Sequence, residues 1–149
     1  MAQESKIEEI LAPYGAFITY VPLRTEVPFR DYMSMRDGDI VYEIAPRASL
    51  NPAEEAEKAI AAIGERKAVI LIPGRSFDAS GTRHGQGGGW YDRFLALVPR
   101  GWFRIGFCYE RQFSTTPLVR ESWDQEMDIV CVVTPGGLRV ITPSVSMTL

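Results

Sequence analysis

A six-residue apolar run, Ala68–Pro73 (AVILIP), precedes a long glycine-rich loop and then a segment with helical spacing. A continuous apolar run of this length is typical of a strand that is buried on both faces of a parallel sheet. In an open α/β sheet, ligands bind beyond the carboxyl ends of such strands. The pattern therefore predicts an α/β fold with a ligand site at the loop.

Strand and helix patterns alternate along the rest of the chain. Strands are predicted at Ala16–Val21, Asp39–Ile44, Ala68–Pro73, Phe103–Tyr109, Asp128–Val133 and Leu138–Thr142. Helical patterns occur at Lys6–Ala12, Val27–Met35, Pro52–Ile63 and the segment that contains Tyr91, Phe94, Leu95 and Val98. Alternating elements favour a three-layer α/β/α sandwich around a mainly parallel sheet, with an antiparallel hairpin at its end.

Helix boundaries also carry sequence signals. Ser5 and Glu8 form a candidate capping box for the first helix, which Pro13 would stop. The clearest helix has Asn51 as its cap, Pro52 at its first position and Glu54 completing a box, and Gly64 would end it. Its predicted buried face consists of Ala53, Ala56, Ile60 and Ile63.

Size and composition narrow the class of protein. A chain of 149 residues has the length of one domain, so residues 1–149 are expected to form a single unit. The net charge of −3 argues against nucleic acid as a partner, because there is no basic surplus to displace counterions. No apolar run is long enough to span a membrane, and the N-terminal segment MAQESKIEEIL lacks the features of a signal peptide.

The two cysteines, Cys108 and Cys131, lie in predicted strands. They are expected to be buried thiols, with a disulfide or a metal pair as the alternative. Buried free thiols favour the reducing cytoplasm.

The loop carries glycines and arginines together. Gly81, Gly85, Gly87, Gly88 and Gly89 would bring backbone amides close to a ligand, and Arg75, Arg83 and Arg93 would add positive charge. The following helix would contribute its N-terminal dipole. A flexible turn is the alternative. The position between a buried strand and a helix favours anion binding, although the spacing matches neither a P-loop nor a Rossmann fingerprint.

Asp92 and His84 each allow two interpretations. Asp92 is either a favourable partner for the helix dipole or, if phosphate binds beside it, a ligand for Mg²⁺. His84, the only histidine, is either a solvated loop residue or an acid, base or ligand.

The segment LIPGRSFDASGTRHGQGGGWYDRFL resembles the signature of the 5-formyltetrahydrofolate cyclo-ligase family, also called methenyltetrahydrofolate synthetases. The shared positions are Pro73, Gly74, Phe77, Asp78, Gly81, Arg83, Gly85, Gly87, Gly89, Tyr91, Asp92 and Arg93, with Trp90 in place of a Tyr. The segments YVPLRTEVPF, IGFCYERQ and SWDQEMDIVCVVTP are also similar, with Trp123 in place of a His. The resemblance covers roughly Ala16 to Pro135.

The resemblance implies a Rossmann-like domain of the NagB/RpiA/CoA-transferase type and a reaction that uses ATP and Mg²⁺ to convert 5-formyltetrahydrofolate into 5,10-methenyltetrahydrofolate. It implies catalytic roles for Arg83 and Asp92, with Asp92 as the metal ligand. The implied phosphate-binding residues are Gly81, Arg83, Gly85, Gln86, Gly87, Gly88, Gly89 and Arg93. The implied folate side consists of Tyr20, Glu26, Trp90 and Tyr91, although core packing is an alternative for both tyrosines.

The chain departs from the family pattern at its start. Family members begin with a helix that carries a Lys and an Arg four residues apart, whereas this sequence starts after it and Lys6 has no matching Arg. We expect slow catalysis, with Arg75 as the residue that replaces the lost charge. The partners would be folate and ATP, and the chain would be a monomer or a homodimer. The rivals are a non-catalytic folate- or nucleotide-binding relative and an enzyme of the same fold class with another phosphate- or carboxylate-bearing ligand.

Overall fold

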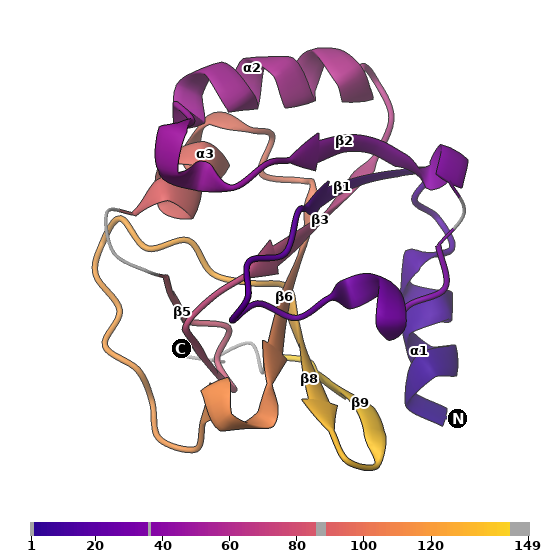
Figure 1. Ribbon diagram of the computed structural model, residues 1–149, viewed down its shortest axis with the longest axis vertical. Helices are drawn as coiled ribbons and strands as arrows, with labels where there is room; N and C mark the ends of the chain where they lie inside the picture. Colours follow the sequence, from indigo (N-terminus) through magenta and orange to yellow (C-terminus); the bar gives the residue numbers. More distant parts are fainter. Residues whose placement is uncertain (1, 36, 86–88, 144–149) are drawn as a thin grey trace, which may run out of the picture.

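The computed structural model describes residues 2–35, 37–85 and 89–143. Its central sheet has the strand order β2-β1-β3-β6-β8-β9 (Figure 1). The strands are β1 (Ala16–Tyr20), β2 (Ile40–Ile44), β3 (Ala68–Pro73), β6 (Phe103–Tyr109), β8 (Ile129–Thr134) and β9 (Gly137–Ile141). All neighbouring strands are parallel except β8 and β9, which are antiparallel. The predicted mainly parallel sheet with a terminal hairpin is confirmed.

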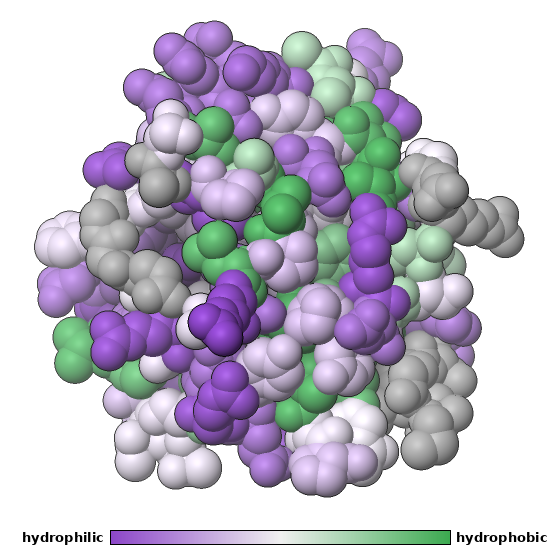
Figure 2. Space-filling view, viewed as in Figure 1, coloured by the Kyte–Doolittle hydropathy of each residue, from purple (hydrophilic) through white to green (hydrophobic). Residues whose placement is uncertain are grey.

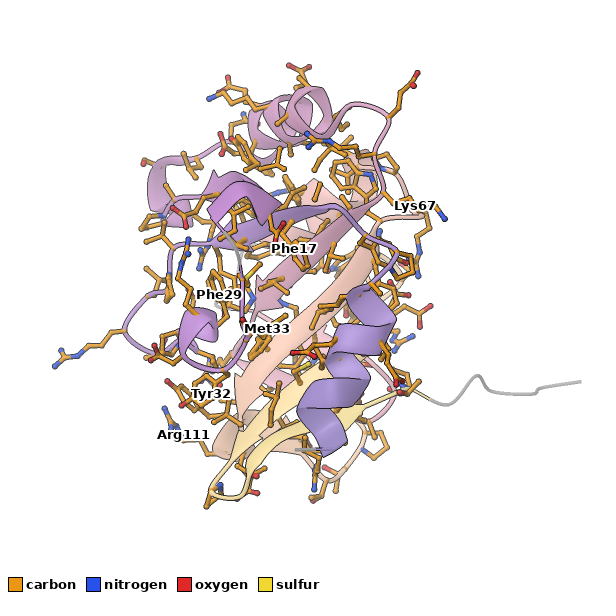
Figure 3. All side chains as sticks on the ribbon, turned by 90° about the vertical axis from the view of Figure 1, so that its right-hand side faces the viewer. Phe17, Phe29, Tyr32, Met33, Lys67 and Arg111 are labelled. Atoms are coloured by element: carbon orange, nitrogen blue, oxygen red, sulfur yellow. The ribbon has the colours of Figure 1, made fainter. Side chains whose placement is uncertain are left out.

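Helical segments cover both faces of this sheet. The helices α2 (Pro52–Ile63) and α3 (Trp90–Leu97) bury their apolar residues in one hydrophobic cluster. The helix α1 (Ala2–Leu11) and the 3₁₀ turn η1 (Phe29–Asp31) contribute to a second cluster, on the side where Figure 3 labels Phe17, Phe29 and Met33. Two separate clusters on the two faces make the fold a three-layer α/β/α sandwich, as predicted.

The helix α2 follows its predicted boundaries. Asn51 Oδ1 accepts hydrogen bonds from the backbone N–H groups of Ala53 and Glu54, at 2.8 and 3.2 Å. Gly64 ends the helix with a φ of 64°. The predicted face is partly wrong, because Ala56 and Ile63 are buried whereas Ala53 and Ile60 are exposed. The helix rests on the sheet through a narrower stripe, and its charged outer face forms the hydrophilic cap at the top of Figure 2.

Two predictions near the N-terminus were wrong. The first helix begins at Ala2 and not at Lys6, so Ser5 lies inside α1 and does not cap it. The helix predicted over Val27–Met35 is only the three-residue turn η1, and the chain is irregular on both sides of it. Pro28 precedes η1, and proline restricts the residue before it to extended backbone, which prevents an earlier helix start.

Three short strands that the sequence did not reveal form a second sheet. They are β4 (Ser76–Asp78), β5 (Arg83–His84) and β7 (Phe113–Ser114), in the order β5-β4-β7. The first half of the glycine-rich loop is thus a hairpin, and Gly81 makes its turn with a φ of 85°. The remaining helical turns are η2 (Asp37–Asp39), η3 (Arg47–Ser49) and η4 (Glu110–Gln112). Among the described residues, no helix combines the length and apolarity that crossing a membrane requires.

Candidate active site

A cavity of about 630 Å³ lies among the segments that follow β1, β2 and β3. Its lining residues are Leu23, Glu26, Pro46, Arg47, Gly74, Arg83, His84, Gly85, Gly89, Trp90, Tyr91, Asp92, Arg93, Val119, Glu121, Trp123 and Asp124. The chain runs from β1 to β2 on one side and then to β3 on the other, so the strand order reverses between β1 and β3. Ligands bind at such reversal points in open α/β sheets, and the volume suits a small molecule.

Arg83 is the buried cation of this cavity. Its Nε donates a hydrogen bond of 2.6 Å to the carbonyl oxygen of Pro73, at the end of β3. Its guanidinium carbon lies 4.9 Å from the ring centroid of Tyr91. Burial lowers the pKa of Arg83, and the nearby charge of Asp92 raises it. An arginine keeps its proton under these conditions, so the site contains a fixed positive charge that is shielded from water.

Two glycines make room for this guanidinium. A Cβ atom on Gly85 would lie 3.0 Å from Nη2 of Arg83. A Cβ atom on Gly74 would lie 3.0 Å from Nε of Arg83 and 2.9 Å from the ring of Phe77. These glycines therefore permit close packing around Arg83, in addition to any contact they make with a ligand.

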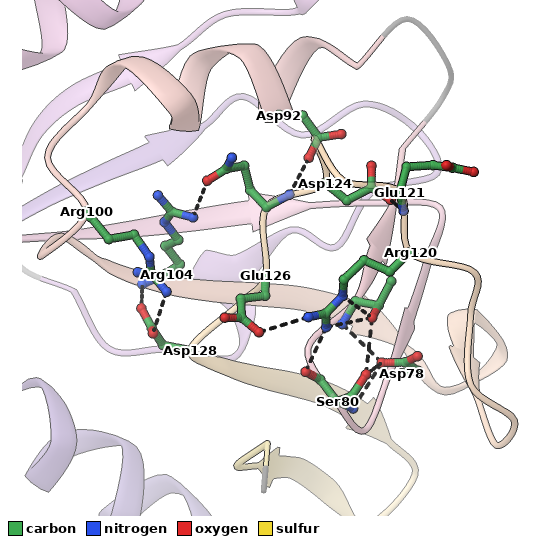
Figure 4. Close-up of polar contacts among 12 residues, drawn as sticks. Asp78, Ser80, Asp92, Arg100, Arg104, Arg120, Glu121, Asp124, Glu126 and Asp128 are labelled. Carbon is green, nitrogen blue, oxygen red and sulfur yellow. Dashed lines mark hydrogen bonds and ion pairs between the residues drawn. The ribbon is translucent and has the colours of Figure 1, made fainter. Parts of the chain in front are cut away.

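Asp92 and Asp124 bring two carboxylates to the cavity. Asp92 lies in the first turn of α3, and its Oδ1 accepts a hydrogen bond of 3.0 Å from the backbone N–H of Gln125 (Figure 4). Burial raises the pKa of Asp92, the hydrogen bond from Gln125 and the charge of Arg83 oppose the rise, and the charge of Asp124 adds to it. A bound cation would relieve the repulsion between the two carboxylates.

Asp124 belongs to a segment that a polar cluster fixes to the small sheet (Figure 4). The buried carboxylate of Asp78 accepts hydrogen bonds from Ser80, from the N–H of Thr82 and from the N–H of Leu118. Arg120 donates to the hydroxyl of Thr82 at 2.7 Å. These contacts attach residues 118–120 to the β4–β5 hairpin, and so fix the chain that continues to Trp123 and Asp124.

Arg47 is a lining residue that the sequence reasoning missed. It forms an ion pair with Glu26, and its guanidinium carbon lies 5.4 Å from the ring centroid of Tyr91. The signal that could have found it is its position, because Arg47 comes three residues after β2 ends, at the ligand-binding edge of the sheet.

The structure brings most of the predicted site residues to one cavity. Glu26, Arg83, Gly85, Gly89, Trp90, Tyr91, Asp92 and Arg93 all line it. Gln86, Gly87 and Gly88 lie outside the described residues. Tyr20 and Gly81 are not among the lining residues of the described chain.

Tyr20 and Gly81 have structural contacts. Tyr20 is fully buried, and its hydroxyl donates a hydrogen bond of 2.7 Å to the carbonyl oxygen of Val27. Gly81 is buried in the hairpin turn, where a Cβ atom would lie 2.7 Å from the carbonyl oxygen of Met127. Tyr20 therefore packs in the core, as its alternative interpretation proposed. Gly81 is required by the conformation of the hairpin turn.

The aromatic residues at the start of α3 are only partly available to a ligand. Trp90 donates from its Nε1 to the carbonyl oxygen of Leu50 at 3.0 Å and stacks on Phe94 with a centroid distance of 5.4 Å. Tyr91 is buried, although its hydroxyl has no hydrogen-bond partner within the described part of the chain. Both residues combine core packing with a surface that faces the cavity.

Arg75, His84 and Trp123 differ in how they relate to the site. Arg75 is exposed and is not part of the cavity lining in the described chain, so its position does not support the expected replacement of lost charge. His84 lines the cavity, and its Nε2 hydrogen-bonds to the carbonyl oxygen of Val119 at 2.6 Å, which connects β5 to the segment that carries Asp124. Trp123 is 63% exposed at the cavity.

Comparisons with known proteins identify the family of the chain and its fold. The family model described as "5-formyltetrahydrofolate cyclo-ligase family" matches residues 18–133. A 5-formyltetrahydrofolate cyclo-ligase from Mycoplasma genitalium is 32% identical over 61 residues, which make up 41% of this chain and 36% of that protein. The aligned part thus spans about a third of the length of the curated relative.

Two solved structures share the fold. A 5,10-methenyltetrahydrofolate synthetase from Mycoplasma pneumoniae has a TM-score of 0.54 and 21% identity, covering 86% of this chain and 80% of that chain. A 5,10-methenyltetrahydrofolate synthetase from Aquifex aeolicus has a TM-score of 0.53 and 19% identity, covering 99% of this chain and 84% of that chain. Because the family model matches well over half of the chain, the protein belongs to the 5-formyltetrahydrofolate cyclo-ligase family.

Proposed function

We propose that the protein uses ATP and Mg²⁺ to convert 5-formyltetrahydrofolate into 5,10-methenyltetrahydrofolate. The observation that carries this proposal is the meeting of Arg83, Asp92 and Asp124 in one cavity at the carboxyl edge of a parallel sheet. A phosphoryl-transfer site needs positive charge for the phosphates and carboxylates for a metal ion. Family membership supplies the substrate class.

The phosphate side of the proposed site consists of Arg83, Arg93 and the glycine-rich loop. Arg83 is buried and held in place by Pro73, so little conformational freedom is lost when it binds a phosphate oxygen. Arg93 is exposed at the cavity and supplies a second positive charge. Gly89 precedes α3 with a left-handed φ of 62°, which any residue with a side chain rarely adopts.

The metal side consists of Asp92 and Asp124. Mg²⁺ is usually held by one or two carboxylates together with phosphate oxygens and water, and this pair fits that preference. The described residues contain no group of three or more acidic, histidine or cysteine side chains that could hold a metal ion. A metal ion held by Asp92 and Asp124 would therefore take further ligands from the phosphates of a bound nucleotide. It would neutralise part of the charge on these phosphates.

The oxygen of a formamide is a poor leaving group, so it must be phosphorylated before the ring can close. The formyl oxygen attacks the terminal phosphorus of ATP, and ADP leaves. The second folate nitrogen then attacks the formyl carbon and loses its proton, phosphate leaves with the formyl oxygen and takes up a proton, and the ring closes. Arg83 stabilises the charge that develops during transfer, because it is fixed in a site with little water. We also propose a cytoplasmic location, because Cys108 and Cys131 are buried free thiols.

The activity is tested directly by absorbance. The purified chain is mixed with 5-formyltetrahydrofolate, ATP and MgCl₂, and the near-ultraviolet absorbance of 5,10-methenyltetrahydrofolate is followed. We expect an absorbance increase that requires both ATP and Mg²⁺, that Asp92→Asn reduces, and that Arg111→Leu leaves unchanged. Arg111 is a suitable control because it is exposed, contacts the ring of Tyr109 and lies outside the cavity lining. Absence of any increase would contradict the proposal.

A further inference from the structure

Arg47 has an unused hydrogen-bond donor inside the cavity region. Its side chain is only 11% exposed, and one edge of its guanidinium is occupied by the carboxylate of Glu26. The other terminal nitrogen, Nη1, is buried and has no hydrogen-bond partner within the residues that the structure describes. Buried donors of a charged group are rarely left without a partner in a folded protein, so an unpaired one at a cavity indicates a ligand.

The surroundings of Nη1 favour an acceptor that carries negative charge. Arg47 and Arg83 both lie against the ring of Tyr91, at 5.4 and 4.9 Å from its centroid. Burial lowers the pKa of Arg83 and the positive charge of Arg47 lowers it further, so an anion near both guanidinium groups would be attracted by both. The hydroxyl of Tyr91 is also buried without a partner among the described residues, and it could donate to the same group.

Glu26 is already engaged by the protein. Its Oε1 accepts a hydrogen bond of 2.9 Å from the backbone N–H of Leu23, and its Oε2 contacts Arg47. The side chain of Glu26 is 4% exposed, and both of its oxygens are engaged. The carboxylate is therefore fixed in place, and it orients the guanidinium of Arg47. In this arrangement Glu26 acts on a ligand largely through Arg47.

We propose that Arg47 binds an oxyanion of the ligand through Nη1, together with Arg83, and that Glu26 positions Arg47 for this contact. The identity of the ligand rests on the proposed function, in which the oxyanion is either a phosphate group of ATP or a carboxylate of the folate tail. Both have the geometry that a guanidinium edge recognises.

The test compares Arg47→Met with a matched control, Arg30→Met. Arg30 makes the same two kinds of contact, an ion pair with Glu43 at 3.4 Å and a contact with the ring of Phe29 at 5.6 Å, but it is exposed and outside the cavity lining. Calorimetry measures the affinity of each protein for pyrophosphate, for 5-formyltetrahydrofolate and for 5-formyltetrahydropteroate, which lacks the glutamate tail.

Loss of one charge-assisted contact is expected to weaken binding about 10- to 100-fold in Arg47→Met and not in Arg30→Met. Weaker pyrophosphate binding identifies a phosphate group as the oxyanion. Weaker binding of 5-formyltetrahydrofolate, with the pteroate compound unchanged, identifies the tail carboxylate. Unchanged affinity for pyrophosphate and for 5-formyltetrahydrofolate would overturn the proposal.

A second variant keeps the test decisive if Arg47→Met does not fold. Glu26→Gln keeps one carbonyl oxygen that can accept from Arg47, so the guanidinium stays in position while a negative charge beside it is removed. This variant is therefore expected to strengthen oxyanion binding, whereas loss of a merely structural ion pair would weaken it or leave it unchanged. The probe for this variant is whichever of pyrophosphate and 5-formyltetrahydrofolate the wild-type protein binds. The proposal is contradicted if Glu26→Gln binds this probe no more tightly than the wild-type protein does. These affinities are independent of turnover, so a failure of the proposed activity and a failure of this inference give different results.

Discussion

Replacing Asp78 by Asn should destabilise the protein because this buried carboxylate accepts hydrogen bonds from three residues, two in the hairpin turn and one in the segment at Leu118. Its Oδ1 accepts from the N–H and the hydroxyl of Ser80, at 3.0 and 2.7 Å, and from the N–H of Thr82 at 3.0 Å. Its Oδ2 accepts from the N–H of Leu118 at 2.8 Å. An amide keeps the shape but can accept on one atom only, so its NH₂ group would face the N–H of Leu118.

The size of the effect follows from these contacts. One broken hydrogen bond to a charged acceptor costs about 1.5–3 kcal/mol, and the bonds that remain lose their charge assistance. We therefore expect the free energy of unfolding to fall by about 2–4 kcal/mol. For a chain of this length, that corresponds to a decrease in Tm of about 5–15 °C. The assay is thermal unfolding followed by circular dichroism, with the exposed Asp31→Asn as the control.

The pH dependence gives an independent check. Burial alone would raise the pKa of Asp78, but the hydrogen bonds from Leu118, Ser80 and Thr82 outweigh it and hold the pKa below its usual range. A lowered pKa means that Asp78 stabilises the fold above about pH 4 and loses this contribution as the pH falls through its folded pKa. The difference between wild type and Asp78→Asn should therefore shrink in acid. A Tm change no larger than that of Asp31→Asn at pH 7 would show that the hydrogen bonds of Asp78 do not stabilise the fold.

Four further predictions concern the cavity and the core. Arg83→Ala should remove most of the thermal stabilisation that ATP gives the wild-type protein, measured as a Tm difference with and without ligand, and an unchanged difference would exclude Arg83 from the phosphate site. Asp92→Asn should weaken binding of Mg-ATP but not of metal-free pyrophosphate in calorimetry, because it removes a metal ligand and a repulsion together; equal weakening would show a structural role only. Arg75→Leu should leave turnover unchanged, because Arg75 is exposed and outside the described cavity lining, and a reduced rate would restore it as the compensating cation. Cys108 should resist iodoacetamide at pH 8 in the folded protein, because burial raises its pKa to about 12, and rapid alkylation seen by mass spectrometry would contradict this burial.

The layered fold could be predicted because its elements are strongly patterned. The apolar strands β3, β6 and β8 are buried along nearly their whole length, and the cap and terminal glycine of α2 have the geometry that their residue types favour. Local conformational preferences and tertiary packing favour the same structure at these positions, so the sequence alone predicts them.

The small sheet could not be predicted for the opposite reason. The strands β4, β5 and β7 have two or three residues each, which is too short for periodicity to appear. They pair with one another through their backbones, and Asp78 adds a hydrogen bond to Leu118, 40 positions further along the chain. No local pattern in the sequence reports such a contact.

Most of the predicted residues that line the cavity belong to one motif, whereas Arg47 and Asp124, which come from separate segments, were missed. Arg83 and Asp92 lie in the glycine-rich signature. Arg47 and Asp124 reach the cavity from the end of β2 and from the segment before β8, so only the strand order shows that they meet. Arg75 is next to Gly74 in the chain, yet it is exposed and is not among the described residues that line the cavity.

In the proposed function, nucleotide phosphates and a divalent metal ion bind together between Arg83 and the carboxylates of Asp92 and Asp124. The most direct measurement is a crystal structure with a non-hydrolysable ATP analogue and Mn²⁺, which anomalous scattering locates without ambiguity. We expect one Mn²⁺ in coordination contact with a carboxylate oxygen of each aspartate, at about 2 Å, and a phosphate oxygen within hydrogen-bond distance of Arg83. A nucleotide bound outside this cavity, or Mn²⁺ that contacts neither aspartate, would contradict it.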